Sequence, residues 1–209
     1  MSAFAVWGTN FVASDAPTEP AADPLTSWVE RARAGDATAF HGLYLRTRKQ
    51  VHHTLYRLIG TNADMEDLVQ QVYLQLLTAL RAFRGDAQFS TFLYRVCANV
   101  ALMHLRKRQR HPEELTDAPL DLVAGEDADP ERAARLRQAA GLCALALDQL
   151  APKKRVVFVY HELLGLMPEE IALALDVPVN TVRSRLHHAR LEFAKAAAQW
   201  MDPEQRHGA

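Results

Sequence analysis

Residues 168–193, PEEIALALDVPVNTVRSRLHHARLEF, constrain the fold most, because they hold two short helical patterns separated by a tight break. The first pattern ends near Asp176, and Pro178 cannot continue that helix but is tolerated where a second one begins. In the second pattern, apolar residues recur on one helical face, at Val182, Leu186, Ala189 and Phe193. The spacing therefore predicts a helix-turn-helix, with the second helix as the reading helix.

The polar face of this second helix carries hydrogen-bond donors of the kind that reach phosphates and base edges in a DNA major groove. These residues are Asn180, Thr181, Arg183, Ser184, Arg185, His188 and Arg190. The alternative is an ordinary helical hairpin with a solvated basic face. It is favoured by Asp176, which stands where a helix-turn-helix often has glycine. The stretch is a candidate DNA-binding element whose role depends on the rest of the chain.

Charge is distributed unevenly along the 209 residues, although the net charge is only -1. Residues 84–110 contain six basic side chains and one acid, whereas residues 111–131 contain eight acids and no lysine or arginine. A basic segment followed by an acidic, proline-bearing one predicts a domain end and a linker. We therefore expect a tail at 1–25, a first domain at 26–110, a linker at 111–130, a second domain at 131–200 and a C-terminal tail at 201–209.

Helical periodicity predicts an all-α fold of two small helical domains joined by a flexible acidic linker. In the first domain, Asp36 is expected to cap a long helix that ends at Gly60. The helix that follows has apolar residues at helical spacing, which predicts one wide buried stripe. The stripe consists of Leu68, Val69, Val72, Tyr73, Leu76, Leu77 and Leu80.

Several classes of protein have no support in the sequence. No run of about 18 apolar residues occurs, so we expect no direct membrane insertion. No lysine or arginine precedes Arg31, which is unlike a secretory signal and favours a cytoplasmic protein. Cys97 and Cys143 are isolated and are interpreted as small core residues. Metal-ligand spacing and a glycine-rich phosphate loop are both lacking, so we expect no metal, no cofactor and no enzyme.

Four fragments, taken together and in this order, resemble a bacterial RNA polymerase sigma factor of the sigma-70 family, extracytoplasmic-function (ECF) group. They are EDLVQQVYLQLL, FRGDAQFSTFLYRVCANVALMHLRKRQR, LDQLAPKKRVVFVYHELLGLMPEEIA and VPVNTVRSRLHHAR. The resemblance covers about residues 26–110 and 140–195 and implies a region 2 domain followed by a region 4 domain. It further implies a non-catalytic initiation factor that binds core RNA polymerase and promoter DNA, and an anti-sigma factor as another partner.

The resemblance also implies roles for particular residues. Contacts to the polymerase clamp would fall on Asp67, Gln70 and Gln71, where position 71 more usually carries glutamate. The minus-ten element, including a flipped base held by the loop 84–90, would be contacted by Arg84, Gly85, Asp86, Phe89, Asn99, Arg106, Lys107 and Arg108. The minus-35 element would be contacted by Asn180, Thr181, Arg183, Ser184, Arg185 and His188, with histidine at 188 where arginine is common.

A helix-turn-helix regulator that binds palindromic operators as a dimer is the alternative function. It leaves the surface around Asp67 and the loop at 84–90 without a role, and no dimerisation heptads are evident. The acidic linker is also open to two interpretations. The resemblance implies a segment that mimics nucleic acid inside the polymerase, and the alternative is a solvated spacer.

Overall fold

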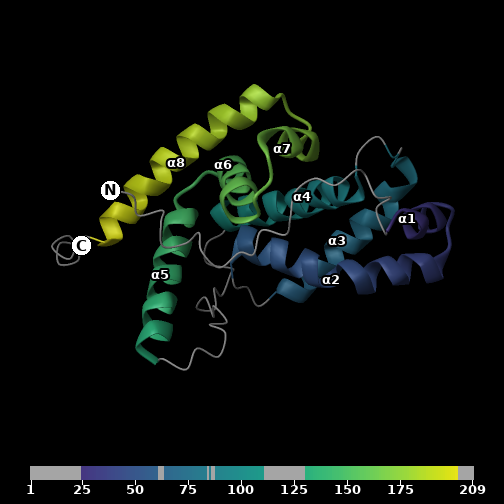
Figure 1. Cartoon of the computed structure of the whole chain (residues 1–209), viewed down its shortest axis with the longest axis horizontal. Coiled ribbons are helices and arrows are strands. Elements are labelled where there is room, and N and C mark those ends of the chain that lie inside the picture. The colour runs from purple at the N-terminus through teal and green to yellow at the C-terminus, as the bar shows by residue number, and fades with distance from the viewer. Residues whose placement is uncertain (1–24, 61–63, 84, 86–87, 111–129, 202–209) are drawn as a thin grey trace.

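The structure is a computed structural model that describes residues 25–60, 64–83, 85, 88–110 and 130–201. Within these ranges every regular element is helical (Figure 1), as the sequence predicted. The elements are α1 (Thr26–Arg33), α2 (Ala37–Ile59), α3 (Met65–Ala79), the short 3-10 turn η2 (Leu80–Ala82), α4 (Phe89–Arg110), α5 (Pro130–Asp148), α6 (Pro152–Phe158), the π-helical turn η4 (Val159–Leu163), α7 (Pro168–Leu175) and α8 (Val179–Met201). The expected acidic linker and both tails lie largely outside the described residues.

The first four helices form an N-terminal group around α2. Asp36 caps α2, because its Oδ1 accepts hydrogen bonds from the backbone N–H groups of Thr38 and Ala39 at 2.9 and 3.0 Å. Gly60 ends the helix at a φ of 93°, which a side chain would disfavour. Both predictions for this helix are confirmed. Helices α3 and α4 pack against α2, and their apolar faces meet in a core that includes Leu55, Val72, Leu76, Leu93 and Val100.

The predicted buried stripe of α3 is confirmed except at one position. Leu68, Val69 and Val72 are buried, but the side chain of Leu77 is 47% exposed. Leu77 lies three residues after Leu74, which is 68% exposed, and seven residues after Gln70. Residues at those spacings share one face of a helix, so Leu77 belongs to the outer face of α3 and its predicted burial is wrong.

Helices α5 to α8 form a C-terminal group in which α6 and α5 both pack against α8. The helix-turn-helix consists of α7 and α8, as the sequence predicted. Asp176 turns the chain between them in the left-handed region, at a φ of 54°, which aspartate tolerates better than most residues with a side chain. Glu170 supports the start of α7, because its Oε2 accepts a hydrogen bond from the N–H of Met167 at 2.7 Å.

The N-terminal and C-terminal groups pack directly against each other, a contact that the sequence did not predict. Helix α4 contacts α6 and α7, and α2 contacts η4, so that α7 lies beside α4 in Figure 1. The aromatic rings of Tyr94 and Tyr160 meet across this boundary with centroids 5.4 Å apart. The hydroxyl of Tyr160 donates to the carbonyl oxygen of Tyr94 at 2.6 Å. Buried apolar residues of both groups therefore form one continuous core.

Candidate nucleic-acid and polymerase interfaces

Helix α8 presents the polar face that the sequence predicted. Val182, Leu186 and Ala189 are buried against the rest of the C-terminal group, which turns the opposite side of the helix outward. On that side Asn180, Arg183, Ser184 and His188 are exposed, whereas Thr181 and Arg185 are half-buried. The arrangement leaves a row of donors over the first three turns of α8, with the geometry of a helix that can enter a major groove.

Two arginines on the outer side of α8 are paired with carboxylates of neighbouring segments. Arg183 donates from Nη2 to Oε1 of Glu169, on α7, at 2.8 Å. Arg190 donates from Nε to Oε1 of Glu162, in η4, at 2.7 Å. The Arg183 pair is largely exposed on both sides, so solvent and salt weaken it and the guanidinium can exchange the carboxylate for another anion.

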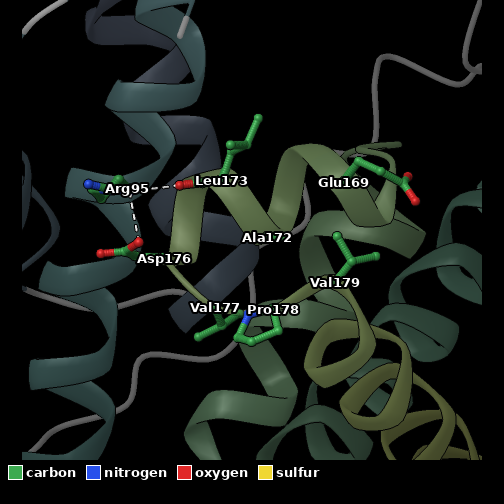
Figure 2. A pocket seen from close by; sticks show the side chains of 8 residues that line it. All are labelled: Arg95, Glu169, Ala172, Leu173, Asp176, Val177, Pro178 and Val179. Atoms are coloured by element: carbon green, nitrogen blue, oxygen red, sulfur yellow. Dashed lines mark hydrogen bonds and ion pairs between the residues drawn. The ribbon is translucent and has the colours of Figure 1, made fainter. Parts of the chain in front are cut away.

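A shallow groove lies where the helix-turn-helix meets α4 (Figure 2). Arg95 of α4 reaches the end of α7, donating from Nη2 to the carbonyl oxygen of Leu173 at 2.8 Å and from Nε to that of Ala174 at 3.3 Å. Its guanidinium also lies 3.9 Å from Oδ1 of Asp176. A positive group at a helix C-terminus complements the helix dipole and satisfies its last carbonyls. The groove is lined by Arg95, Glu169, Ala172, Leu173, Asp176, Val177, Pro178 and Val179.

Only some of the residues predicted to contact the minus-ten element lie on one exposed surface. Asn99, Arg106 and Lys107 are exposed along α4, and Arg108 is mostly covered. Gly85 is exposed and adopts a φ of 81°, which favours glycine in this loop. Arg84 and Asp86 lie outside the described residues.

Phe89, one of the residues that the resemblance assigns to the minus-ten element, is covered in this structure. Its side chain is only 4% exposed, because the ring packs in an aromatic cluster with Phe83 and Phe92. The ring centroids of Phe89 lie 6.4 Å from that of Phe83 and 6.5 Å from that of Phe92. Phe89 would have to leave this cluster to stack on a base, so in the present conformation the ring supports the fold of the loop.

The outer face of α3 holds the residues expected to contact the polymerase. Asp67 and Gln70 are exposed, and Gln71 is half-buried. Leu74 lies one turn further along the same face and is also exposed, which the apolar pattern of the helix did not predict. The combination of polar side chains around an exposed leucine is typical of a protein-binding surface.

Arg155 is a charged residue whose position the sequence did not reveal. Its side chain is 3% exposed, and it donates from Nε to the carbonyl oxygen of Leu58 at 2.6 Å and from Nη2 to that of Ile59 at 3.1 Å. Its third partner is the carboxylate of Asp148. Burial lowers the pKa of Arg155 from its ordinary value, and the nearby Asp148 carboxylate opposes that shift.

The described part of the chain offers no group of three or more histidine, cysteine or acidic side chains that could hold a metal ion. Cys97 is buried and Cys143 half-buried, as expected of small core residues. Among the described helices, none is both long and apolar enough to cross a membrane.

Comparison with known proteins identifies the family. Residues 43–111 match Sigma-70 region 2, and residues 144–193 match Sigma-70, region 4. The chain is 33% identical over 175 residues to the RNA polymerase sigma-H factor of Pseudomonas aeruginosa, covering 80% of this chain and 91% of that relative. It is 32% identical over 172 residues to the ECF RNA polymerase sigma-E factor of Escherichia coli K12, covering 78% of this chain and 88% of that relative. The chain therefore belongs to the sigma-70 family, in its extracytoplasmic-function group.

Solved structures support the same fold. CnrH, solved in complex with the cytosolic domain of CnrY, aligns with a TM-score of 0.56 at 24% identity, over 81% of this chain and 94% of that chain. The sigma factor RpoE of Bartonella quintana, solved with the anti-sigma factor NepR, aligns with a TM-score of 0.57 at 17% identity, over 76% of this chain and 96% of that chain. With both family regions present in the order predicted from the sequence, the alternative of a dimeric operator-binding regulator is not favoured.

Proposed function

We propose that this chain gives core RNA polymerase its promoter specificity, with three separate surfaces performing three tasks. The outer face of α3, with Asp67, Gln70 and Gln71, binds the polymerase. Helix α4 and the loop before it engage the minus-ten element. The polar face of α8 reads the minus-35 element. The observation that carries the proposal is that exposed polar side chains lie on three separate helices of one chain from the sigma-70 family. They are Asp67 and Gln70 on α3, Asn99, Arg106 and Lys107 on α4, and Asn180, Arg183, Ser184 and His188 on α8.

The chemistry of each surface supports its assigned task. Arg183, Ser184 and His188 can donate to base edges or phosphates, and Asn180 and Thr181 lie at the start of α8, where a helix favours an anion. Arg106, Lys107 and Arg108 are suited to phosphates at the end of α4. Asn99 can both donate and accept hydrogen bonds to an unpaired base.

In this proposal the protein acts by binding polymerase and DNA and catalyses no reaction. It acts in the cytoplasm, where bacterial transcription takes place. An anti-sigma factor is the proposed regulatory partner. That proposal is supported by the structural similarity to RpoE of Bartonella quintana, which was solved as a complex with the anti-sigma factor NepR.

In vitro run-off transcription with purified bacterial core polymerase and a library of promoter sequences tests the proposal. We expect transcripts that require this protein and start only from templates sharing two separated sequence elements. Specific binding of the protein alone to palindromic DNA, without any effect on core polymerase, would contradict the proposal and support the dimeric regulator instead.

A further inference from the structure

Two adjacent histidines, His187 and His188, stand on the proposed reading face of α8. His187 lies seven residues after Asn180 and four after Arg183, and residues at these spacings share one side of a helix. His188 lies four residues after Ser184. Both imidazoles are exposed, with ring centroids 5.5 Å apart, and neither forms a hydrogen bond or an ion pair with another described residue. Their nitrogen atoms are therefore open to a ligand that approaches this face.

The surface around these histidines is positively charged. Residues 179–191 contain three arginines but no aspartate or glutamate. Glu169 of α7 and Glu162 of η4 reach this surface, but each is already paired. Glu169 accepts from Arg183, and Glu162 accepts from Arg190. A face that combines cationic groups with two open imidazoles suits a polyanion.

The other carboxylates on the described elements that pack against α8 also have partners. Glu192, four residues after His188, pairs with Lys154 of α6. The remaining pairs are Glu131 with Arg135 on α5, Asp148 of α5 with Arg155 of α6, and Glu170 of α7 with the backbone N–H of Met167. No acid, lysine or arginine described on these elements forms a hydrogen bond or an ion pair with either imidazole. A positive charge gained by these rings would therefore be neutralised by a group outside the protein.

The chemistry of imidazole links such a contact to pH. Histidine is the side chain whose charge ordinarily changes between pH 5 and 8. The neutral ring has one N–H donor, whereas the protonated ring has two donors and a positive charge. A phosphate within hydrogen-bond distance favours the charged form of a histidine, so the complex with DNA binds more protons than the free protein. By linkage, binding then strengthens as pH falls.

We propose that His187 and His188 form a proton-linked contact with minus-35 DNA, in which imidazolium N–H groups donate to phosphate oxygens. Each proton comes from solvent and stays on its ring while the DNA is bound. Acidification therefore strengthens the hold of α8 on the promoter, whereas an arginine at either position would carry its charge at every physiological pH. This inference rests on the proposed function, because it requires α8 to lie on DNA.

The test measures promoter binding by holoenzyme at pH 6.0 and pH 7.5, at one ionic strength, on a template recovered from the run-off transcription library. The variants are the double substitution His187→Gln with His188→Gln and the matched control His52→Gln, at an exposed position on α2. Core polymerase contributes a pH dependence of its own, so the quantity compared is each protein's ratio of dissociation constants at the two pH values. We expect this ratio to be about three- to tenfold larger for wild type and H52Q than for the double glutamine variant.

Substitution of both histidines by arginine separates proton uptake from simple contact. The double arginine variant keeps its charge at both pH values, so we expect it to bind tightly at each and to show the small ratio of the double glutamine variant. Both histidines are exposed, and we expect the circular dichroism spectra of all variants to match wild type. If the double variants fail to fold, the single substitutions His187→Gln and His188→Gln should each remove part of the wild-type ratio.

Two outcomes would overturn the proposal. A wild-type ratio in the folded glutamine variants would show that neither histidine takes up a proton on DNA. An equal loss of affinity at both pH values would show a contact without proton uptake. Absence of promoter-dependent binding by wild-type holoenzyme would instead refute the proposed function, so the two failures are distinguishable.

Discussion

Oε1 of Glu169, on α7, accepts a hydrogen bond from Nη2 of Arg183, on α8, at 2.8 Å. The first helix of the helix-turn-helix therefore orients an arginine on the proposed reading face of the second. This exposed pair orients the guanidinium in the absence of DNA without binding it strongly. A DNA base or phosphate that meets Arg183 must compete with Glu169.

The role of Arg183 can be separated from general phosphate attraction by its substitution with alanine. If Arg183 reads a base, we expect Arg183→Ala to cost about 1–3 kcal/mol on the preferred minus-35 sequence and to relax discrimination at one base pair. Binding to a panel of single-base promoter variants measures both effects. Lys195→Ala, at an exposed position further along α8, is the control. An equal loss on every sequence would show that Arg183 contacts a phosphate.

Glu169 is expected to restrain DNA binding, because its negative charge lies beside the reading face. Glu169→Gln removes that charge and frees the Arg183 guanidinium, so we expect affinity for both specific and unrelated DNA to rise about two- to fivefold. Titrations at several salt concentrations check this, since the gain should shrink as salt screens the charge. Unchanged affinity at low salt would show that the pair has no influence on binding.

The polymerase surface on α3 is tested with Asp67→Ala and Gln70→Ala in one protein. Both side chains are exposed, so we expect the melting temperature to stay within about 2 °C of wild type while affinity for core polymerase falls about tenfold or more. Lys49→Ala, at an exposed position on α2, controls for general surface changes. Wild-type polymerase affinity in the double variant would place the interface elsewhere.

The ring of Trp28 lies so close to Gly42 on α2 that we expect position 42 to require glycine. A Cβ at position 42 would lie 2.4 and 2.5 Å from two atoms of the Trp28 ring, and the guanidinium of Arg46 lies over that ring at 4.1 Å. Because the ring must move, we expect Gly42→Ala to lower the free energy of unfolding by about 1–3 kcal/mol.

Gly141→Ala is the matched control for that substitution. Gly141 is also helical, in α5, but a Cβ there meets nothing within 4 Å. Alanine favours the helix by about 0.5–1 kcal/mol, so we expect Gly141→Ala to be neutral or stabilising. Urea denaturation of the two variants measures the difference, and equal effects would contradict the role of the Trp28 contact.

Because the thiols of Cys97 and Cys143 are shielded from solvent, we expect the free energy of unfolding to fall at alkaline pH. Burial raises the pKa of the Cys97 thiol from 9.0 to about 12 and that of Cys143 from 9.0 to about 11. Above pH 9 the unfolded chain therefore binds fewer protons than the folded protein, and the free energy of unfolding falls as pH rises. Each thiol contributes a slope of up to about 1.4 kcal/mol per pH unit.

Denaturation curves between pH 8 and pH 10 check this slope. Cys97→Ala should remove about half of it, while Cys143 supplies the remainder. At higher pH, Tyr73 adds a similar term, because burial raises its pKa from 10.0 to about 12. A wild-type slope in Cys97→Ala would show that the Cys97 thiol does not contribute.

Sequence alone determined the features that depend on neighbours along the chain. The Asp36 cap, the end of α2 at Gly60 and the turn at Asp176 each follow from the preferences of a few adjacent residues. Amphipathic spacing likewise predicted which sides of α3 and α8 are buried, with Leu77 as the exception. These local rules were enough to predict an all-α fold and a helix-turn-helix.

Only the tertiary structure decided how the two helical groups meet. Arg155 in the stretch PKKRVVF looks like one of three basic residues at a helix start, yet it is buried because the carbonyl oxygens of Leu58 and Ile59, nearly 100 positions earlier, approach it. Phe89 is covered for a similar reason, by Phe83 and Phe92 across a loop. Burial of a side chain depends on which surfaces the folded chain brings together, and helical periodicity carries no information about partners so distant in sequence.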